Sequence, residues 1–238
     1  LQNAVIEKDQ TCEWCYKFAK DVPNADIEKL QNTTIEKDKT DQWCYMFAKY
    51  TSNIDIKGLQ DAVIEKDQDG MWCYMFARNI RNADIEKLQN VVIEKDKTGE
   101  WCYWFAKHIS NVDTKKLQNA IIEKDQKGRW CYNFAENVPN VDIEELQKIV
   151  IERDNVGKWC CFFARNVSNA DIEKLQSIVF EKDQTGEWCY WFFTNVLSDV
   201  DIKKFQNIIV ERDQTGEWCY KFAYIRPHYN NIKLQDAV

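Results

Sequence analysis

Residues 84–109 read DIEKLQNVVIEKDKTGEWCYWFAKHI, and this stretch decides the fold. In Ile85–Ile93 the apolar residues take positions i, i+3, i+7 and i+8, which form one face of a helix. In Trp101–Ile109 they take i, i+1, i+4, i+5 and i+8, which is again one helix face. Gly99 suits a left-handed turn residue at a helix end. The stretch therefore predicts two short helices joined by a tight turn.

The same stretch recurs along the whole chain, and a fixed period is typical of repeat architectures. The leucine of the first helix recurs as Leu30, Leu59, Leu88, Leu117, Leu146, Leu175, Phe205 and Leu234, preceded by Leu1. The tryptophan of the second helix recurs as Trp14, Trp43, Trp72, Trp101, Trp130, Trp159, Trp188 and Trp218. The period is 29 residues, with one extra residue near Leu197.

Short links between the helices predict antiparallel neighbours. Asp84, before the first helix, is a typical N-cap, and the apolar residue before it is placed for a hydrophobic staple. Helices this short are not stable alone, so adjacent hairpins must share a core. We therefore expect an all-α fold: one α-solenoid domain, residues 1–238, of about eight stacked antiparallel hairpins in a right-handed superhelix.

The motif Trp-Cys-Tyr-x-Phe-Ala, followed by Asp-Ile-x-x-Leu-Gln, resembles short helical-hairpin tandem repeats of uncharacterised bacterial and phage proteins. The resemblance covers the whole chain. It implies a repeat scaffold and carries no known activity. The TPR, Sel1-like and HEAT solenoids are similar in architecture only, because the TPR spacing of about 34 residues is absent.

The second helix is predicted to bury an arc that runs from its tryptophan to its alanine. At about 100° per residue, phenylalanine, valine or isoleucine, and cysteine lie between these two limits. The tryptophan and cysteine columns are therefore expected to be core. Equivalent cysteines one repeat apart are too distant for disulfides, so we expect reduced thiols and a cytoplasmic protein.

Two polar columns are complete in every repeat. We expect the glutamines, such as Gln89, to form a ladder to the next repeat's backbone or tyrosine hydroxyl, because a polar group beside the core must be hydrogen-bonded. The alternative is that their amides clamp an extended peptide. The run Glu94–Asp96 is expected to supply inter-repeat ion pairs and an aspartate that ends the helix.

Functional residues are expected where the copies differ. The position between tyrosine and phenylalanine lies outside the predicted buried arc and holds large apolar groups in most copies. With the column four residues later, it predicts a ridge of apolar and aromatic groups with asparagine donors beside it, a typical partner-binding surface. The ridge residues are Met46, Met75, Trp104, Asn133, Phe162 and Trp191, and the flanking column holds Tyr50, Asn79, His108, Asn137, Asn166 and Asn195.

Composition narrows the function further. The formal net charge of -7 disfavours nucleic acid. No segment is apolar enough for a membrane span. No phosphate loop, nucleophile motif or metal-ligand spacing is present, so we expect no enzyme, cofactor or metal.

The leading hypothesis is a protein- or peptide-binding scaffold. A sharper form, implied only by the resemblance, is a phage or bacterial inhibitor that grips a host defence protein. One alternative is a single-stranded RNA-binding repeat that uses the basic column Lys20, Lys49, Arg78, Lys107 and Arg165 beside aromatic rings. Another is head-to-tail self-association, because the terminal helices are expected to lack polar caps.

Overall fold

A computed structural model describes residues 1–196 and 202–225. Within these ranges every regular element is a helix, as predicted, and the helices pair as stacked antiparallel hairpins. The chain divides into two compact units, Leu1–Lys124 and Asp125–Val238. The extra residue near Leu197 and the last copies of the leucine and glutamine columns, Leu234 and Gln235, lie outside the described residues.

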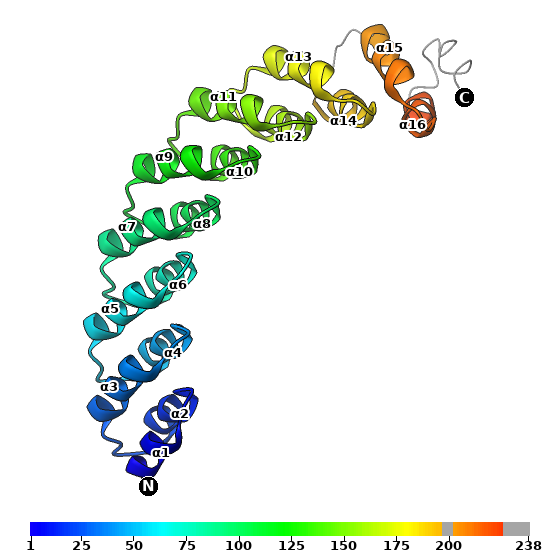
Figure 1. The fold of residues 1–238 in the computed structure, drawn as a ribbon. Coiled ribbons are helices and arrows are strands. Elements are labelled where there is room, and N and C mark those ends of the chain that lie inside the picture. Colours follow the sequence, from blue (N-terminus) through cyan, green and yellow to red (C-terminus); the bar gives the residue numbers. More distant parts are fainter. Residues whose placement is uncertain (197–201, 226–238) are drawn as a thin grey trace. The chain divides into compact units, whose positions relative to one another are not determined.

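In the first unit, first and second helices alternate, and each contacts the next along the chain (Figure 1). The first helices are α1 (Gln2–Lys8), α3 (Ile27–Lys37), α5 (Ile56–Lys66), α7 (Ile85–Lys95) and α9 (Thr114–Lys124). The second helices are α2 (Glu13–Asp21), α4 (Gln42–Tyr50), α6 (Met71–Asn79) and α8 (Glu100–His108).

The second unit repeats the pattern. Its first helices are α11 (Ile143–Arg153), α13 (Ile172–Lys182) and α15 (Ile202–Arg212). Its second helices are α10 (Arg129–Asn137), α12 (Lys158–Asn166), α14 (Glu187–Val196) and α16 (Glu217–Ile225). Within each unit, successive second helices also contact one another, for example α4 with α6 and α12 with α14.

From α3 to α13, the aspartate before each first helix is the predicted N-cap. The side chain of Asp84 accepts a hydrogen bond from the Lys87 amide at 3.0 Å, and Asp142 accepts one from the Glu145 amide at 2.9 Å. These carboxylates satisfy backbone donors that the helix itself leaves free, and they offset the helix dipole.

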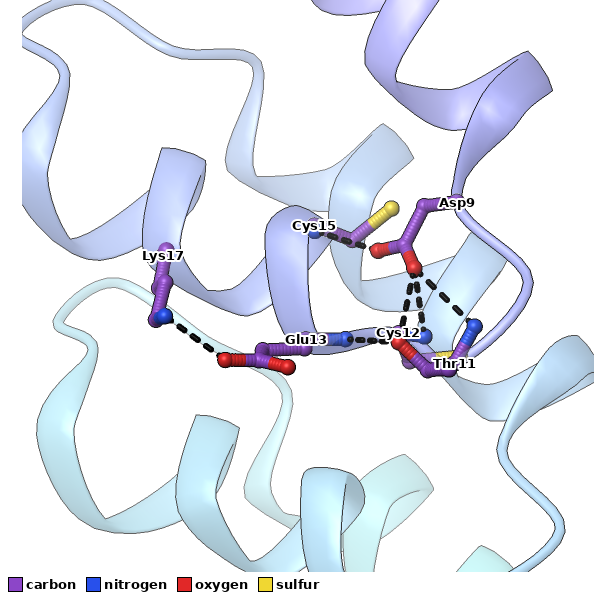
Figure 2. A network of polar contacts seen from close by, with 6 residues as sticks. All are labelled: Asp9, Thr11, Cys12, Glu13, Cys15 and Lys17. Carbon is purple, nitrogen blue, oxygen red and sulfur yellow. Dashed lines mark hydrogen bonds and ion pairs between the residues drawn. The ribbon is translucent and has the colours of Figure 1, made fainter.

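A second aspartate, at the end of the Glu-Lys-Asp run, is buried and organises the turn between the helices. Figure 2 shows the first copy: Asp9 Oδ1 accepts from the Thr11 and Cys12 amides, and Oδ2 accepts from the Cys15 amide at 2.8 Å. These bonds lower the pKa of Asp9 although burial opposes them. The predicted helix-ending aspartate thus also caps the start of the second helix.

In the repeats where its contacts are described, the cation of this run bonds to backbone oxygens and not to the carboxylates of the expected inter-repeat ion pairs. Lys95 Nζ donates instead to the backbone oxygens of Ile64 at 2.5 Å and Asp67 at 2.6 Å, at the C-terminal end of the preceding first helix. Arg153 and Arg212 make the same kind of bond to Asp125 and Asp183. The cation suits this helix end because the dipole is negative there.

The glutamine ladder is confirmed. Gln31 Nε2 donates to the Asp55 backbone oxygen at 3.1 Å, and its Oε1 accepts from the Asp55 amide at 2.9 Å. The backbone amides of Asp84, Asp113 and Asp171 donate equivalent bonds to Oε1 of the glutamine 24 residues earlier. The glutamines therefore fix one repeat to the next, and the buried amides are committed to the fold rather than to a peptide ligand.

The core of the second helices differs from the prediction at one edge. The cysteines and most phenylalanines are buried as expected. The tyrosine column is buried in most repeats, for example Tyr74 at 4% exposed, although the predicted arc left it out; Tyr220, in the last second helix, is 63% exposed. The tryptophans are mostly half-buried, and Trp14 is 58% exposed. The reason is that the tryptophan of the next repeat packs on the tyrosine, as Trp101 does on Tyr74, and so lies at the edge of the core.

Candidate functional site

The predicted ridge lies on the second helices, one residue per helix, and is described here unit by unit. In the first unit Met46, Met75 and Trp104 are each half-buried. In the second unit Asn133 and Phe162 are half-buried, whereas Trp191 is 41% exposed. The ridge residues are therefore accessible in part, and each also packs against its own frame.

The aromatic ridge residues are held by neighbouring rings. Trp104 stacks on His108, with ring centroids 5.1 Å apart and planes at 8°. Phe162 contacts Tyr132, Trp159 and Trp188 at centroid distances of 5.8–5.9 Å. Such contacts fix the rings and lower the entropy that a binding partner would otherwise have to remove.

The flanking column is mostly engaged inside the molecule. His108 Nδ1 lies 2.8 Å from the Tyr74 hydroxyl, and Asn166 Nδ2 donates to the Tyr132 hydroxyl at 2.8 Å. Burial, with the charges of Arg78 and Lys107, lowers the pKa of His108.

Three other asparagines of this column donate to their own helices. Asn79 Nδ2 bonds the Met75 backbone oxygen at 2.8 Å, and Asn137 and Asn195 make equivalent bonds. The expected row of free asparagine donors is thus not what the structure presents. Tyr50, at 48% exposed, and His108 are the large groups of the flanking column that reach solvent.

The exposed basic column lies against the tyrosines. Lys49 Nζ donates to the Tyr45 hydroxyl at 3.0 Å, and Arg78 Nη1 donates to the Tyr74 hydroxyl at 2.8 Å. These cations also sit 5.4–5.9 Å from the tyrosine ring centroids, within reach of a cation–π attraction.

A groove of about 370 Å³ opens between α12 and α14. It is more apolar than polar, and it contains two of the predicted ridge residues. Its lining consists of Lys158, Cys161, Phe162, Arg165, Glu187, Trp188, Trp191 and Asn195. Aromatic walls with a few convergent polar groups are typical of a binding site.

A larger hollow, of about 690 Å³, lies at the start of α11 and α13 and is lined mainly by charged and polar groups. Two of its carboxylates, Asp142 and Asp171, already cap their helices. Their role there is structural.

The chain was compared with protein-family models, with curated proteins and with solved structures. No family model, curated protein or solved structure matches the chain.

In residues 1–196 and 202–225, no group of three or more His, Cys, Asp or Glu side chains is placed to hold a metal ion. Nor does any helix in these ranges combine the length and apolarity of a membrane span.

Two features of the site were not found from the sequence. One is the packing of tyrosines on the next repeat's tryptophan, as with Tyr74 and Trp101, which depends on the register between neighbouring helices. The other is the groove at Cys161. The available signal was that Cys161 stands where the other seven copies have tyrosine.

Proposed function

We propose that this chain is a non-catalytic scaffold that binds a protein or peptide partner on the ridge of its second helices. The ridge has a constant frame: glutamine ladders, capped helices and buried cysteines recur from repeat to repeat. On this frame one exposed or half-exposed position changes from methionine to tryptophan, asparagine or phenylalanine. A constant frame with varied contact residues is typical of solenoids that select a partner.

The observation that carries the proposal is the groove between α12 and α14 with Trp191 at its edge. Tryptophan, methionine and arginine are favoured at interface centres because they bury a large area. Trp191 is 41% exposed, and Arg165 lines the same groove. A partner side chain placed there would cover the tryptophan and meet a cation.

Two finer points belong to the same proposal. The resemblance to short hairpin repeats of bacterial and phage proteins supports a scaffold, and its sharper form is an inhibitor that grips a host defence protein. The ten cysteines are buried and free, which suits a reducing compartment such as the cytoplasm.

The test is capture of a partner, followed by direct measurement of its affinity. The wild-type chain and a Met75→Ser/Trp191→Ser variant would be compared as baits, and the captured protein would then be purified for calorimetry. We expect the variant to bind at least about tenfold more weakly, since central aromatic anchors often contribute more than about 1.4 kcal/mol.

Val156→Ser is the matched control. Val156 is also apolar and 50% exposed, but it lies in the turn before α12, so the control should bind as wild type does. Unchanged helical circular dichroism would exclude unfolding. Equal binding by all three proteins would overturn the ridge as the contact surface.

A second candidate function is binding of single-stranded RNA. The observation in its favour is the exposed cations over tyrosine rings, such as Lys49 and Arg78. RNA binding would weaken steeply with salt because phosphate contacts release counterions. Recovery of RNA alone, with strong salt dependence, would favour this function over the scaffold.

A further inference from the structure

The tyrosine column provides a template for how this fold holds a phenol ring. In the second unit, Tyr132 packs on Trp159 with ring centroids 5.9 Å apart, and Tyr190 packs on Trp218 at 5.4 Å. In the first unit Tyr74 stacks on Trp101 at 5.8 Å. In each case a tyrosine of one second helix fills the space beside the tryptophan of the next.

The hydroxyl of that tyrosine is recognised from two fixed positions. The first is four residues later on the same helix: Arg78 donates to the Tyr74 hydroxyl at 2.8 Å. The second is 34 residues later, on the next second helix: His108 lies 2.8 Å from Tyr74 Oη, and Asn166 donates to Tyr132 Oη. The site is therefore an aromatic wall with polar groups at its end.

One copy lacks the tyrosine but keeps the rest of the site. Cys161 occupies the tyrosine position on α12 and supplies no ring to Trp188. Trp188 instead meets the edge of Phe162, at 5.9 Å and 69°. The groove of about 370 Å³ opens at this place, lined by all three residues.

The two recognition positions are also filled in this copy. Arg165 stands four residues after Cys161, as Arg78 does after Tyr74, and Asn195 stands 34 residues after it; both line the groove. The Asn195 Nδ2 donates to the Trp191 backbone oxygen and to Thr194 Oγ1. Its Oδ1 is the atom offered to an incoming hydroxyl.

We propose that this groove binds a tyrosine side chain presented by a partner protein or peptide. The ring would take the place that the chain's own tyrosine occupies in the other repeats, beside Trp188 and Phe162. The phenol oxygen would accept a hydrogen bond from Arg165, and the phenol O–H would donate one to Asn195 Oδ1. Lys158 and Arg165 outnumber Glu187 among the charged groups that line the groove, which suits the partial negative charge of the phenol oxygen. The inference rests on the proposed scaffold function and names the partner's chemistry.

The probe for this site is p-cresol, the side-chain analogue of tyrosine, added to the full chain. Binding would be followed through the indole N–H resonances of Trp188 and Trp191 in protein labelled with ¹⁵N-tryptophan. We expect a saturable shift in the millimolar range, as suits so small a ligand. Toluene, which lacks the hydroxyl, should bind at least about fivefold more weakly because both hydrogen bonds of the hydroxyl are lost.

Two variants of the same residue make the test specific. Cys161→Tyr restores the chain's own ring, so p-cresol binding should disappear. Cys161→Ala keeps the space, so binding should stay within about twofold of wild type. Persistence of the shift in Cys161→Tyr, equal affinity for toluene and p-cresol, or no saturable shift in wild type would each overturn the proposal.

A converse variant guards against a Cys161→Tyr chain that does not fold. Tyr74→Cys removes the template ring beside Trp101 while Arg78 and His108 remain. It should gain a p-cresol site, read at the Trp101 indole. Absence of that gain in a folded Tyr74→Cys chain would count against the template.

The scaffold function and the tyrosine site fail separately. If Trp191→Ser weakens partner binding but Cys161→Tyr does not, the scaffold stands and the tyrosine site falls. A wild-type dimer that Cys161→Tyr breaks would assign the groove to a second copy and overturn the proposal of a partner's tyrosine.

Discussion

Asp41 is the residue that fits its place least well. It stands where six other repeats have glycine, and its backbone adopts a left-handed φ of 64°. The side chain is 4% exposed, and among the described residues its Oδ1 has no hydrogen-bond partner. Burial, together with the charges of Asp67 and Asp38, raises the pKa of Asp41 to about 7, against the opposing effect of Lys66 and Lys95.

The substitution Asp41→Gly is expected to stabilise the protein, and more so at high pH. The folded pKa lies above the ordinary value of 3.8. The contribution of protonated Asp41 to stability is therefore complete below about pH 4 and is lost as pH rises through about 7. Glycine relieves the strain of the left-handed backbone, which should raise the free energy of unfolding by about 1 kcal/mol at any pH. Loss of the buried carboxyl adds to this, so urea unfolding should show a larger gain at pH 8 than at pH 4.5.

Cys12→Gly is the control for this prediction. Cys12 holds the equivalent position with φ 73°, and burial raises its pKa to about 11. It therefore stays neutral between pH 4.5 and 8, and its substitution should change stability by a similar amount at both. A pH-independent gain in Asp41→Gly would contradict the assignment of a buried, titrating carboxyl.

At the scale of the helices, the cation at the end of most described first helices joins two repeats. Lys95→Met removes the bonds from Nζ to the backbone oxygens of Ile64 and Asp67. We expect a loss of about 1.5–3 kcal/mol, the range for hydrogen bonds to a charged group. Urea unfolding would measure the loss.

Lys95→Arg is the matched variant, because the chain itself uses Arg153 and Arg212 for the same bond. It should retain most of the stability. If Lys95→Met and Lys95→Arg were equally destabilised, the effect would come from side-chain packing rather than from the bonds to the helix end.

The helices were predictable because each carries its own signals. The apolar spacing gives the face, Asp84 gives the start, and Gly99 marks the turn between the pair. Gly99 has φ 87°, as a left-handed turn requires, and it stands directly before the second helix. The handedness of the superhelix stays a prediction.

The error at the tryptophan edge has a different cause. Periodicity shows which residues share a face of one helix, but not which neighbour covers that face. Tyr74 is buried because Trp101 and His108 of the next second helix, α8, lie over it. The groove could not be predicted for the same reason. A cysteine at position 161 indicates a groove only when the position of the tyrosine ring in the other repeats is known.

At the scale of the whole chain, the ten cysteines report on how firmly the repeats hold together. All are buried and free, and burial raises every thiol pKa, that of Cys161 to about 12. Alkylation needs a thiolate, so it must wait for a local opening. We expect labelling by iodoacetamide at pH 8 to be at least about a hundredfold slower than in urea, for openings of about 3 kcal/mol.

Mass spectrometry after timed labelling would resolve the individual cysteines. A surface thiol introduced by Glu94→Cys, at an exposed position, should label at the unfolded rate and serves as the control. Rapid labelling of a native cysteine in the folded chain would mean that its repeat opens far more easily than its burial implies.

The bonds that join repeats also bear on how such a chain can change in length. Most of the described ones reach 24, 28, 31 or 34 residues along the sequence, as with Gln31 to Asp55, Lys95 to Ile64 and Asn166 to Tyr132. An in-frame duplication or deletion of 29 codons brings the same donors and acceptors back to the same separations. The gene can therefore gain or lose whole copies while every junction is remade, and each new copy is free to diverge at its ridge residue.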